Sequence, residues 1–164
     1  MNFRPSELNK WYKTKSGDIN SKLVINAINK VFDASSDKKI IYFGPNSIIK
    51  NIMNDNYSFN SFFISYSDNA DIKAEIQKLP LQNSSIDFVI LIHSLDMDKN
   101  PHAAFREIDR VLEDDGKIII VGFNRLSFLG IYSFMPFNSM FRNKNYLSIS
   151  RLSDWMSLFS YEVK

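Results

Sequence analysis

Two kinds of apolar pattern alternate along the chain, and together they predict an α/β domain. Short, nearly continuous apolar runs are typical of strands that are buried in a sheet. These runs lie at residues 38–44, 62–66, 86–95 and 117–124, with a shorter candidate at 72–76. Segments with apolar residues at helical spacing lie at 18–35, 48–53, 101–112 and 149–160. Apolar strands that alternate with amphipathic helices favour a parallel sheet with helices on both faces.

The two longer amphipathic segments show which helix faces are expected to be buried. In the first, one face carries Leu23, Val24, Ala27, Ile28, Val31 and Phe32. In the second, one face carries Ala104, Phe105, Ile108, Val111 and Leu112. Two oppositely charged pairs lie three residues apart on its outer side, Arg106 with Asp109 and Glu107 with Arg110.

Residues that favour helix ends mark several boundaries. Asn100 before Pro101 is typical of an N-cap followed by proline in the first turn. Gly116 is expected to adopt a left-handed conformation where this helix ends. Ser150 is expected to cap the last helix.

The composition fits one domain of ordinary globular character. The chain has 164 residues, of which 45% are hydrophobic, and 20 basic against 18 acidic residues give a net charge of +2. This weak charge does not indicate a nucleic-acid partner. Absence of cysteine excludes disulfides and thiolate metal sites. The N-terminus has no apolar signal-peptide region and no run is long enough to span a membrane, so we expect a cytoplasmic protein.

The stretch "IIYFGPNSIIKNIM", residues 40–53, reads as a buried strand, a tight turn and the start of a helix. Nucleotide-binding folds often place several glycines at such a junction, but here Gly44 is followed at once by Pro45. Ligands of parallel α/β sheets bind outside the carboxyl ends of the strands. The candidate site is therefore formed by the loops that follow Phe43, Tyr66, His93 and Gly122.

The segment from Lys78 to Asn124 resembles the class I S-adenosylmethionine-dependent methyltransferases, in the subgroup called type 11. It contains "LPL", then "IDFVILIHSL", then "NPHAAFREIDRVL", "DDG" and "KIIIVGFN", in the order and spacing of that family. The stretch "WYKTKSGD" near the N-terminus is similar to the Trp-x-x-Thr-x-x-Gly entry of some bacterial members. The resemblance implies a Rossmann-like, doubly wound, mostly parallel sheet in a single domain. Its expected parts are an N-terminal helical region (1–36), the core (37–124) and an aromatic-rich C-terminal segment (125–164).

The resemblance also implies S-adenosylmethionine as cofactor and a set of residues around it. The family's loop after the first strand holds the methionine part, an acid after the second strand binds the ribose, and a later acid lies near the adenine. Residues after the fourth strand line the methyl-transfer cleft. Carried over, these positions are Gly44 and Asn46 in the loop, Asp68 for the ribose, Glu75 and Ile76 beside the adenine, and His93 and Ser94 at the cleft.

The chain departs from the family pattern in three places. The family's Gly-x-Gly-x-Gly is reduced to Gly44, and Pro45 removes one backbone donor. The ribose-binding acid is not at the expected position, which leaves Asp68 as the candidate. The chain ends where the family continues into its sixth and seventh strands, so we expect either a fragment of a longer protein or a trimmed domain.

Each candidate also has a purely structural interpretation. Gly44 could be a turn glycine, while Asp68 and Glu75 could be solvated loop acids. His93 could be a general base, but a structural histidine is the favoured interpretation. With only two histidines and no ligand cluster, no metal site is expected. The stripe Phe128, Ile131, Tyr132 and Met135 suits core packing, with a lid or membrane contact as the alternative.

These observations lead to a first hypothesis of an enzyme that transfers a methyl group from S-adenosylmethionine to a small-molecule substrate. Such enzymes work by direct displacement, for which the protein mainly aligns the reactants. The alternative is a catalytically inactive methyltransferase-fold scaffold or protein-binding module. A nicotinamide dehydrogenase is disfavoured because its Gly-x-Gly-x-x-Gly signature is absent as well.

Overall fold

A computed structural model of the chain describes residues 5–31, 37–55, 60–66, 69–123 and 147–163. Its helices are α1 (Pro5–Tyr12), α2 (Lys15–Val31), α3 (Asn46–Asp55), α4 (Ser94–Met97), α5 (Pro101–Val111) and α7 (Ile149–Leu158). Its strands are β1 (Ile40–Phe43), β2 (Ser61–Ser65), β3 (Ile72–Lys73), β4 (Ile86–Ile92) and β5 (Leu112–Val121). None of the helices among these residues is long and apolar enough to cross a membrane.

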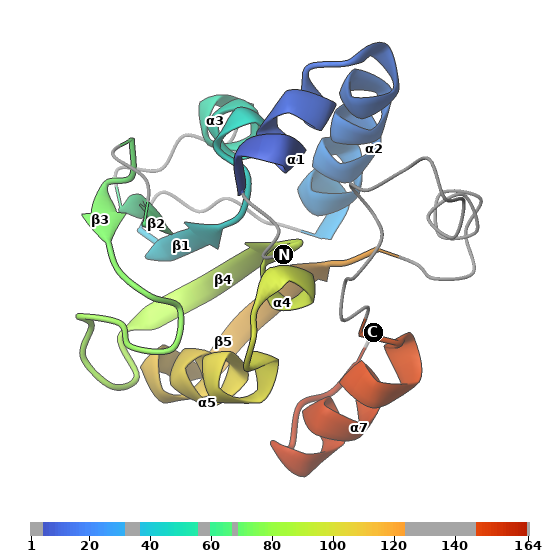
Figure 1. The fold of residues 1–164 in the computed structure, drawn as a ribbon. Helices are drawn as coiled ribbons and strands as arrows, with labels where there is room; N and C mark the ends of the chain where they lie inside the picture. The colour runs from blue at the N-terminus through green and yellow to red at the C-terminus, as the bar shows by residue number, and fades with distance from the viewer. Residues whose placement is uncertain (1–4, 32–36, 56–59, 67–68, 124–146, 164) are drawn as a thin grey trace.

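The five strands form one parallel sheet in the order β3-β2-β1-β4-β5. Figure 1 shows α1, α2 and α3 on one face of the sheet and α5 and α7 on the other. The chain builds outward from β1 to β3 and then returns to place β4 on the other side of β1. The direction of winding therefore reverses between β1 and β4, where ligands of such sheets bind. The predicted parallel α/β sheet is confirmed.

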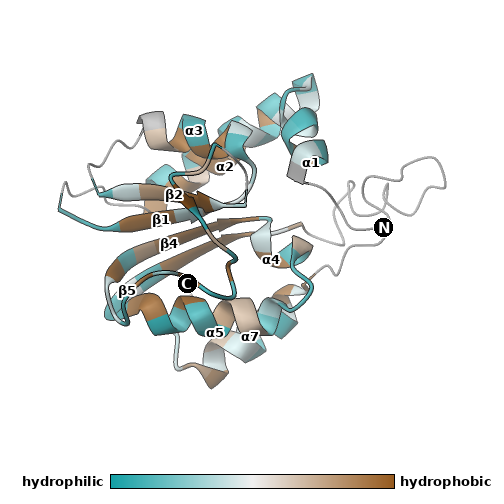
Figure 2. Cartoon of the chain, turned by 60° about the vertical axis from the view of Figure 1, so that its left-hand side comes forward, coloured by the Kyte–Doolittle hydropathy of each residue, from teal (hydrophilic) through white to brown (hydrophobic). Residues whose placement is uncertain are grey.

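The central strands β1 and β4 are buried on both faces, as their continuous apolar runs predict. Side chains alternate across the sheet, so Ile40 and Tyr42 enter one hydrophobic cluster with residues of α1, α2 and α3. Ile41 and Phe43 enter a second cluster with residues of α5. Figure 2 shows this as hydrophobic colour along β1 and β4 between the two helical layers.

The buried face of α2 differs from the one predicted. Ser21, Ile25 and Ile28 are buried, whereas Leu23 and Val31 are 62% and 67% exposed. Leu23 and Ile28 are five residues apart, which places them about 140° apart around a helix, so both cannot face the sheet. The face that contains Ile25 and Ile28 packs on the sheet, and Leu23 points outward.

The predicted start of α5 is confirmed, but two other helix ends are not. The Asn100 side chain accepts a hydrogen bond from the Ala103 amide, and Pro101 begins the helix. The helix ends at Val111 and β5 follows at once, so the left-handed end predicted at Gly116 is wrong. Gly116 instead lies against Leu112, whose Cγ would be only 2.5 Å from an added Cβ. Likewise Ser148, not Ser150, caps α7 by accepting from the Arg151 amide.

Helix α7 is joined to α5 through aromatic side chains. Phe105 is fully buried and lies edge-to-face against Phe159 and Tyr161, with ring centroids 5.1 and 5.8 Å away. The Tyr161 hydroxyl also donates a 2.8 Å hydrogen bond to Asp109. The expected aromatic stripe between Phe128 and Met135 falls outside the described residues.

Candidate functional site

A cavity of about 460 Å³ opens at the carboxyl ends of β1 and β2, a volume typical of small-molecule sites. Its walls come from the ends of these strands, from the segment that follows β3, and from α4 with the turn after it. The lining residues are Phe43, Gly44, Ile64, Ser65, Tyr66, Ala74, Glu75, Ile76, Gln77, Ser94, Met97, Asp98, Lys99 and Asn100. Two of the four loops predicted to form a site, those after Phe43 and His93, thus border this cavity, together with Tyr66 at the start of a third.

The structure brings some of the predicted site residues together. Gly44, Glu75, Ile76 and Ser94 all line the cavity. Asn46 and His93 are not among its lining residues as the structure describes them. The ribose candidate Asp68 lies outside the described residues.

Sequence reasoning missed a polar wall formed by Tyr66, Gln77 and Asp98. A hydrogen bond between Tyr66 and Glu75 raises the pKa of Tyr66, with slight desolvation and the Glu75 charge acting in the same direction. Gln77 donates from Nε2 to Asp98 Oδ1 at 2.6 Å, and the Asn100 amide donates to the same oxygen at 2.7 Å. The position of Tyr66 directly after β2 is the one feature of the sequence that could have indicated this wall. Nothing in the sequence indicates the contact between Gln77 and Asp98.

Gly44 is needed for the approach of β1 to β4. Its φ of +147° is a backbone conformation that favours glycine, and a Cβ added there would lie 2.5 Å from the Ile92 carbonyl oxygen. The first amides of α3 also have partners within the chain. Ser47 N–H donates to Asn9 Oδ1 at 3.0 Å, and the Ile48 and Ile49 amides donate to the Pro45 carbonyl at 3.2 Å. This turn therefore does not present a row of open amides to a ligand.

His93 lies in a buried cluster next to the cavity. Its Nε2 is 2.7 Å from the Tyr12 hydroxyl, and its ring stacks on Phe123 with centroids 3.8 Å apart. Its Nδ1 is 3.7 Å from Asp96 Oδ2, which also accepts a hydrogen bond from the Phe123 amide. Burial raises the pKa of Tyr12 well above its usual value, so this hydroxyl stays protonated. These contacts favour the structural interpretation of His93.

Comparison with known proteins finds similarity to methyltransferases in the part of the chain that forms most of this cavity. A family model described as a methyltransferase domain matches residues 52–120, from within α3 to within β5. This match covers 69 of the 164 residues of the chain. In sequence, the chain is 37% identical over 94 residues to the uncharacterized protein YafS of Escherichia coli K12. That match covers 56% of this chain and 39% of YafS, so the chain spans about two fifths of this relative's length.

Solved structures show the same Rossmann-like fold. A methyltransferase from Thermotoga maritima that depends on S-adenosylmethionine superposes with a TM-score of 0.72 at 18% identity, over 96% of this chain and 78% of that one. The [4+2]-cyclase SpnF superposes with a TM-score of 0.53 at 18% identity, over 65% of this chain and 46% of SpnF. At these identities the likeness concerns the fold, and the predicted fold class is confirmed.

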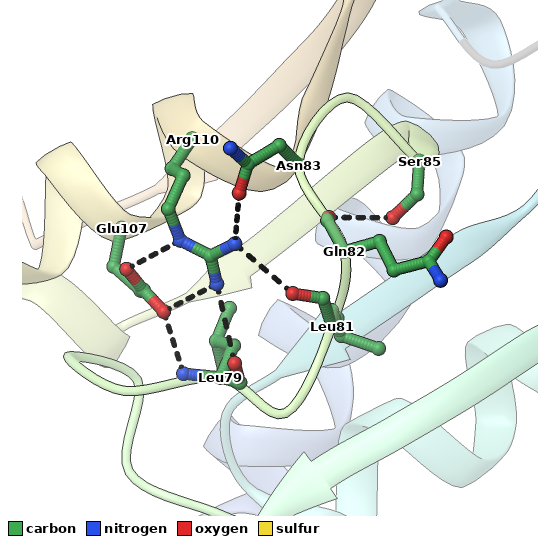
Figure 3. Close-up of polar contacts among 7 residues, drawn as sticks. All are labelled: Leu79, Leu81, Gln82, Asn83, Ser85, Glu107 and Arg110. Carbon is green, nitrogen blue, oxygen red and sulfur yellow. Dashed lines mark hydrogen bonds and ion pairs between the residues drawn. The ribbon is translucent and has the colours of Figure 1, made fainter.

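A salt-bridged pair holds the chain segment that follows the cavity wall at Gln77 (Figure 3). Arg110 donates to the Leu79 and Leu81 carbonyls at 3.2 and 3.0 Å and to Asn83 Oδ1 at 2.6 Å. It also binds Glu107 through Nε and Nη2, and Glu107 in turn accepts from the Leu79 amide at 2.7 Å. We call this network the Glu107–Arg110 clamp. It holds the "LPLQN" segment, which begins two residues after Gln77 in the cavity wall.

A second carboxylate ties the amino ends of β1 and β4 together. Asp87 accepts from the Lys39 amide at 3.0 Å and from Lys38 Nζ at 2.6 Å. Burial acts to raise the pKa of Asp87, but these two hydrogen bonds outweigh it and the pKa is lowered. Asp87 lies at the edge of the sheet opposite the cavity and has a structural role in this domain.

The clamp makes stability depend on pH. The Arg110 hydrogen bonds lower the pKa of Glu107, against the effect of partial burial and with help from the Leu79 amide. Because the folded-state pKa lies below the unfolded value of about 4.3, this stabilisation is complete above that pH and is lost as the pH falls through the folded-state pKa. We therefore expect Glu107→Gln to be less stable than wild type near neutral pH, by a margin that shrinks in acid. Urea unfolding from about pH 7 to about pH 3 measures that margin.

The exposed Glu162 on the C-terminal segment provides the matched control, as Glu162→Gln. This change should leave the stability difference from wild type constant across the same pH range. If Glu107→Gln and Glu162→Gln give the same profile, the clamp does not stabilise the fold.

Proposed function

We propose that this chain binds S-adenosylmethionine in the cavity and transfers its methyl group to a small-molecule acceptor. The observation that carries this proposal is the position of the cavity. It lies at the carboxyl ends of β1 and β2 in a methyltransferase domain, with the Glu75 carboxylate in its wall. Four residues predicted for the cofactor from the sequence, Gly44, Glu75, Ile76 and Ser94, border this one space.

The chemistry of the lining fits the adenosine part of the cofactor. Glu75 and the Tyr66 hydroxyl offer polar partners for ribose hydroxyls or the adenine amine, and Ile64 and Ile76 offer apolar contacts for a flat ring. Asp98, with the bound Gln77 amide, places a second carboxylate in the same cavity, which suits a cationic ligand. The lining therefore fits the adenosine part of S-adenosylmethionine, and its carboxylates favour the positive charge of this cofactor.

At the methionine end the fit depends on few backbone groups. Pro45 has no N–H, and the Ser47, Ile48 and Ile49 amides bond within the chain. Binding there must rely on the atoms of Gly44 and Ser94 that face the cavity. We expect an affinity weaker than that of a site with a complete glycine-rich loop.

The residues of this chain would act by binding and alignment. When bound, the cofactor supplies a methyl group on a positively charged sulfur, open to direct displacement. Glu75 would orient the ribose or adenine, and Asp98 would favour the positive charge. Met97 and Ile76 would keep water from the bound group. None of these steps requires His93 as a base.

A second candidate function is a scaffold or protein-binding module that has the methyltransferase fold without its reaction. The observation that favours it is the turn after β1. The glycine there is explained by packing against Ile92, and the following amides are satisfied within the chain. The two functions differ in one measurable property, cofactor binding.

Isothermal titration calorimetry with S-adenosylmethionine and S-adenosylhomocysteine tests the proposal. We expect saturable one-to-one binding that Glu75→Ala weakens at least about tenfold, since a carboxylate that accepts hydrogen bonds from the ligand is lost. The matched control is Glu113→Ala, because Glu113 is exposed in the amino-terminal part of β5, away from the carboxyl ends of the strands. No heat for either ligand from folded protein would support the scaffold function.

A further inference from the structure

Helix α1 has a place in the fold that the proposed function does not explain. It lies against α3 and α2, on the face of the sheet opposite α5 (Figure 1). Leu8 is fully buried in the hydrophobic cluster that contains Ile40, Ile48 and Ile90, so this helix is part of the core. Asn9 and Tyr12 are three residues apart and share one side of the helix. Each makes a hydrogen bond to a segment that borders the cavity.

The first contact is made by Asn9 at the start of α3. Its Oδ1 accepts from both the amide and the hydroxyl of Ser47, each at 3.0 Å. Ser47 follows three residues after Gly44, which lines the cavity. An N-terminal amide of a helix prefers an acceptor, and here the acceptor comes from α1, 38 residues earlier in the chain.

The second contact is made by Tyr12 at the end of β4. Its hydroxyl lies 2.7 Å from His93 Nε2, and both side chains are about 95% buried. His93 directly precedes Ser94, which lines the cavity. His93 has a left-handed backbone, with φ 55° and ψ 11°, which is unfavourable for a residue with a side chain. Such a conformation persists only where the surroundings hold it. Here the His93 amide donates to the Val121 carbonyl at 2.7 Å, and the ring is held by Tyr12, Phe123 and Asp96.

The motif "WYKTKSG" fixes the angle at which α1 reaches these segments. Thr14 Oγ1 donates to the Trp11 carbonyl at 2.7 Å and accepts from the Gly17 amide at 3.2 Å. A Cβ on Gly17 would lie 2.0 Å from the Trp11 carbonyl oxygen, so only glycine allows α2 to pass so close to the end of α1. The motif therefore has a structural role in this chain. It fixes the orientation of α1, and with it the positions of Asn9 and Tyr12 relative to the ends of β1 and β4.

We propose that α1, which Leu8 anchors in the core, acts as a latch on the site through two hydrogen bonds, Asn9 to Ser47 and Tyr12 to His93. Closed, the latch joins the segment after β1 to the segment after β4, on either side of the point where the sheet reverses its winding. Release of Tyr12 removes the side-chain bond that helps to hold His93 in its left-handed conformation, which lets Ser94 shift and opens the part of the cavity that Ser94 lines. This inference rests on the proposed function, because it concerns access to that same site.

Chemical labelling of histidine tests the latch without any ligand. Diethyl pyrocarbonate acylates exposed imidazoles, and the chain has two histidines, buried His93 and partly exposed His102. We expect Tyr12→Phe to raise the labelling rate of His93 about fivefold or more, which is the effect of losing one buried hydrogen bond. The rate for His102 should stay as in wild type. Peptide mass spectrometry reads both rates in one sample.

Tyr161→Phe is the matched control, because it removes another hydroxyl hydrogen bond, that to Asp109, far along the chain. It should leave the His93 rate unchanged. Asn9→Ala breaks the other contact of the latch and should raise the His93 rate in the same way, which provides a second variant if Tyr12→Phe does not fold. Equal His93 rates in wild type and both latch variants would overturn the proposal. So would a rise that His102 shares in proportion, because that indicates global unfolding.

The same variants separate the latch from the proposed function. If wild type binds S-adenosylhomocysteine, the latch predicts faster association in Tyr12→Phe and Asn9→Ala than in Tyr161→Phe, measured by stopped-flow fluorescence. Unchanged association rates in both variants would count against the latch. If no variant binds the ligand, the proposed function fails, while histidine labelling still decides whether α1 opens.

Discussion

Gly44→Ala is expected to lower the free energy of unfolding by about 3 kcal/mol, as a sum of backbone strain and steric overlap. The φ of +147° at this position disfavours any residue with a side chain. The added Cβ would also lie 2.5 Å from the Ile92 carbonyl oxygen and 2.9 Å from the Ile92 Cβ. Both atoms belong to Ile92, which is fully buried in the central strand β4, and this strand cannot move away without disturbing its pairing with β1. Urea unfolding of the two proteins measures the difference.

Gly122→Ala is the matched control for this prediction. Gly122 follows β5 at the same edge of the sheet, but its backbone does not need glycine, and an added Cβ would meet only the Asp96 carboxylate at 3.3 Å. We expect it to cost less than about 1 kcal/mol. If Gly44→Ala is as stable as Gly122→Ala and yet loses binding of S-adenosylmethionine, then Gly44 serves the ligand and the packing explanation is wrong.

The general fold could be predicted from the sequence because a strand buried on both faces is a short run of apolar residues, which a local pattern reveals. The strands β1 and β4 are apolar at every position except Asp87, and such strands occur almost only in parallel sheets covered by helices. The cap at Asn100 was equally local, since an N-cap and a proline in the first turn need only their neighbours. These features depend on a few adjacent residues.

Features that depend on contacts with residues far away in the sequence were predicted wrongly or missed. Leu23 fits a helical stripe, but the sheet contacts a different side of α2. Gly116 is a reasonable helix terminator, but β5 begins before it and uses it for close packing against Leu112. The bond between Tyr12 and His93 joins residues 81 positions apart, and no periodicity records it.

The candidate site shows the same division. Glu75 and Ile76 were located through the spacing of a family motif, and both line the cavity. Asp98 was missed because its role depends on Gln77 reaching across from another loop. Glu107 and Arg110 were seen only as a charged pair on one helix. Their long-range bonds to the segment after Gln77 appear only when α5 is packed against the sheet.

Arg110→Ala should have the second large effect, a loss of about 2 to 3 kcal/mol in the free energy of unfolding. The change removes the donors for the Leu79 and Leu81 carbonyls and for Asn83, and it leaves the Glu107 carboxylate without its charge partner. A surface ion pair alone would contribute little, but here the guanidinium is about one third exposed and binds backbone as well as charge. Arg106→Ala, an exposed position on the same helix, is the matched control and should change stability by less than about 0.5 kcal/mol.

Loss of the clamp is also expected to affect ligand binding. The segment held by Arg110 begins two residues after Gln77, and Gln77 fixes Asp98 across the cavity. Under conditions where Arg110→Ala is still folded, we expect weaker binding of S-adenosylmethionine than in Arg106→Ala, because the wall that carries Glu75 and Gln77 loses its anchor. Calorimetry on the two variants at low temperature makes this comparison. Equal affinities would mean that the wall keeps its shape without the clamp, and that the clamp stabilises the fold alone.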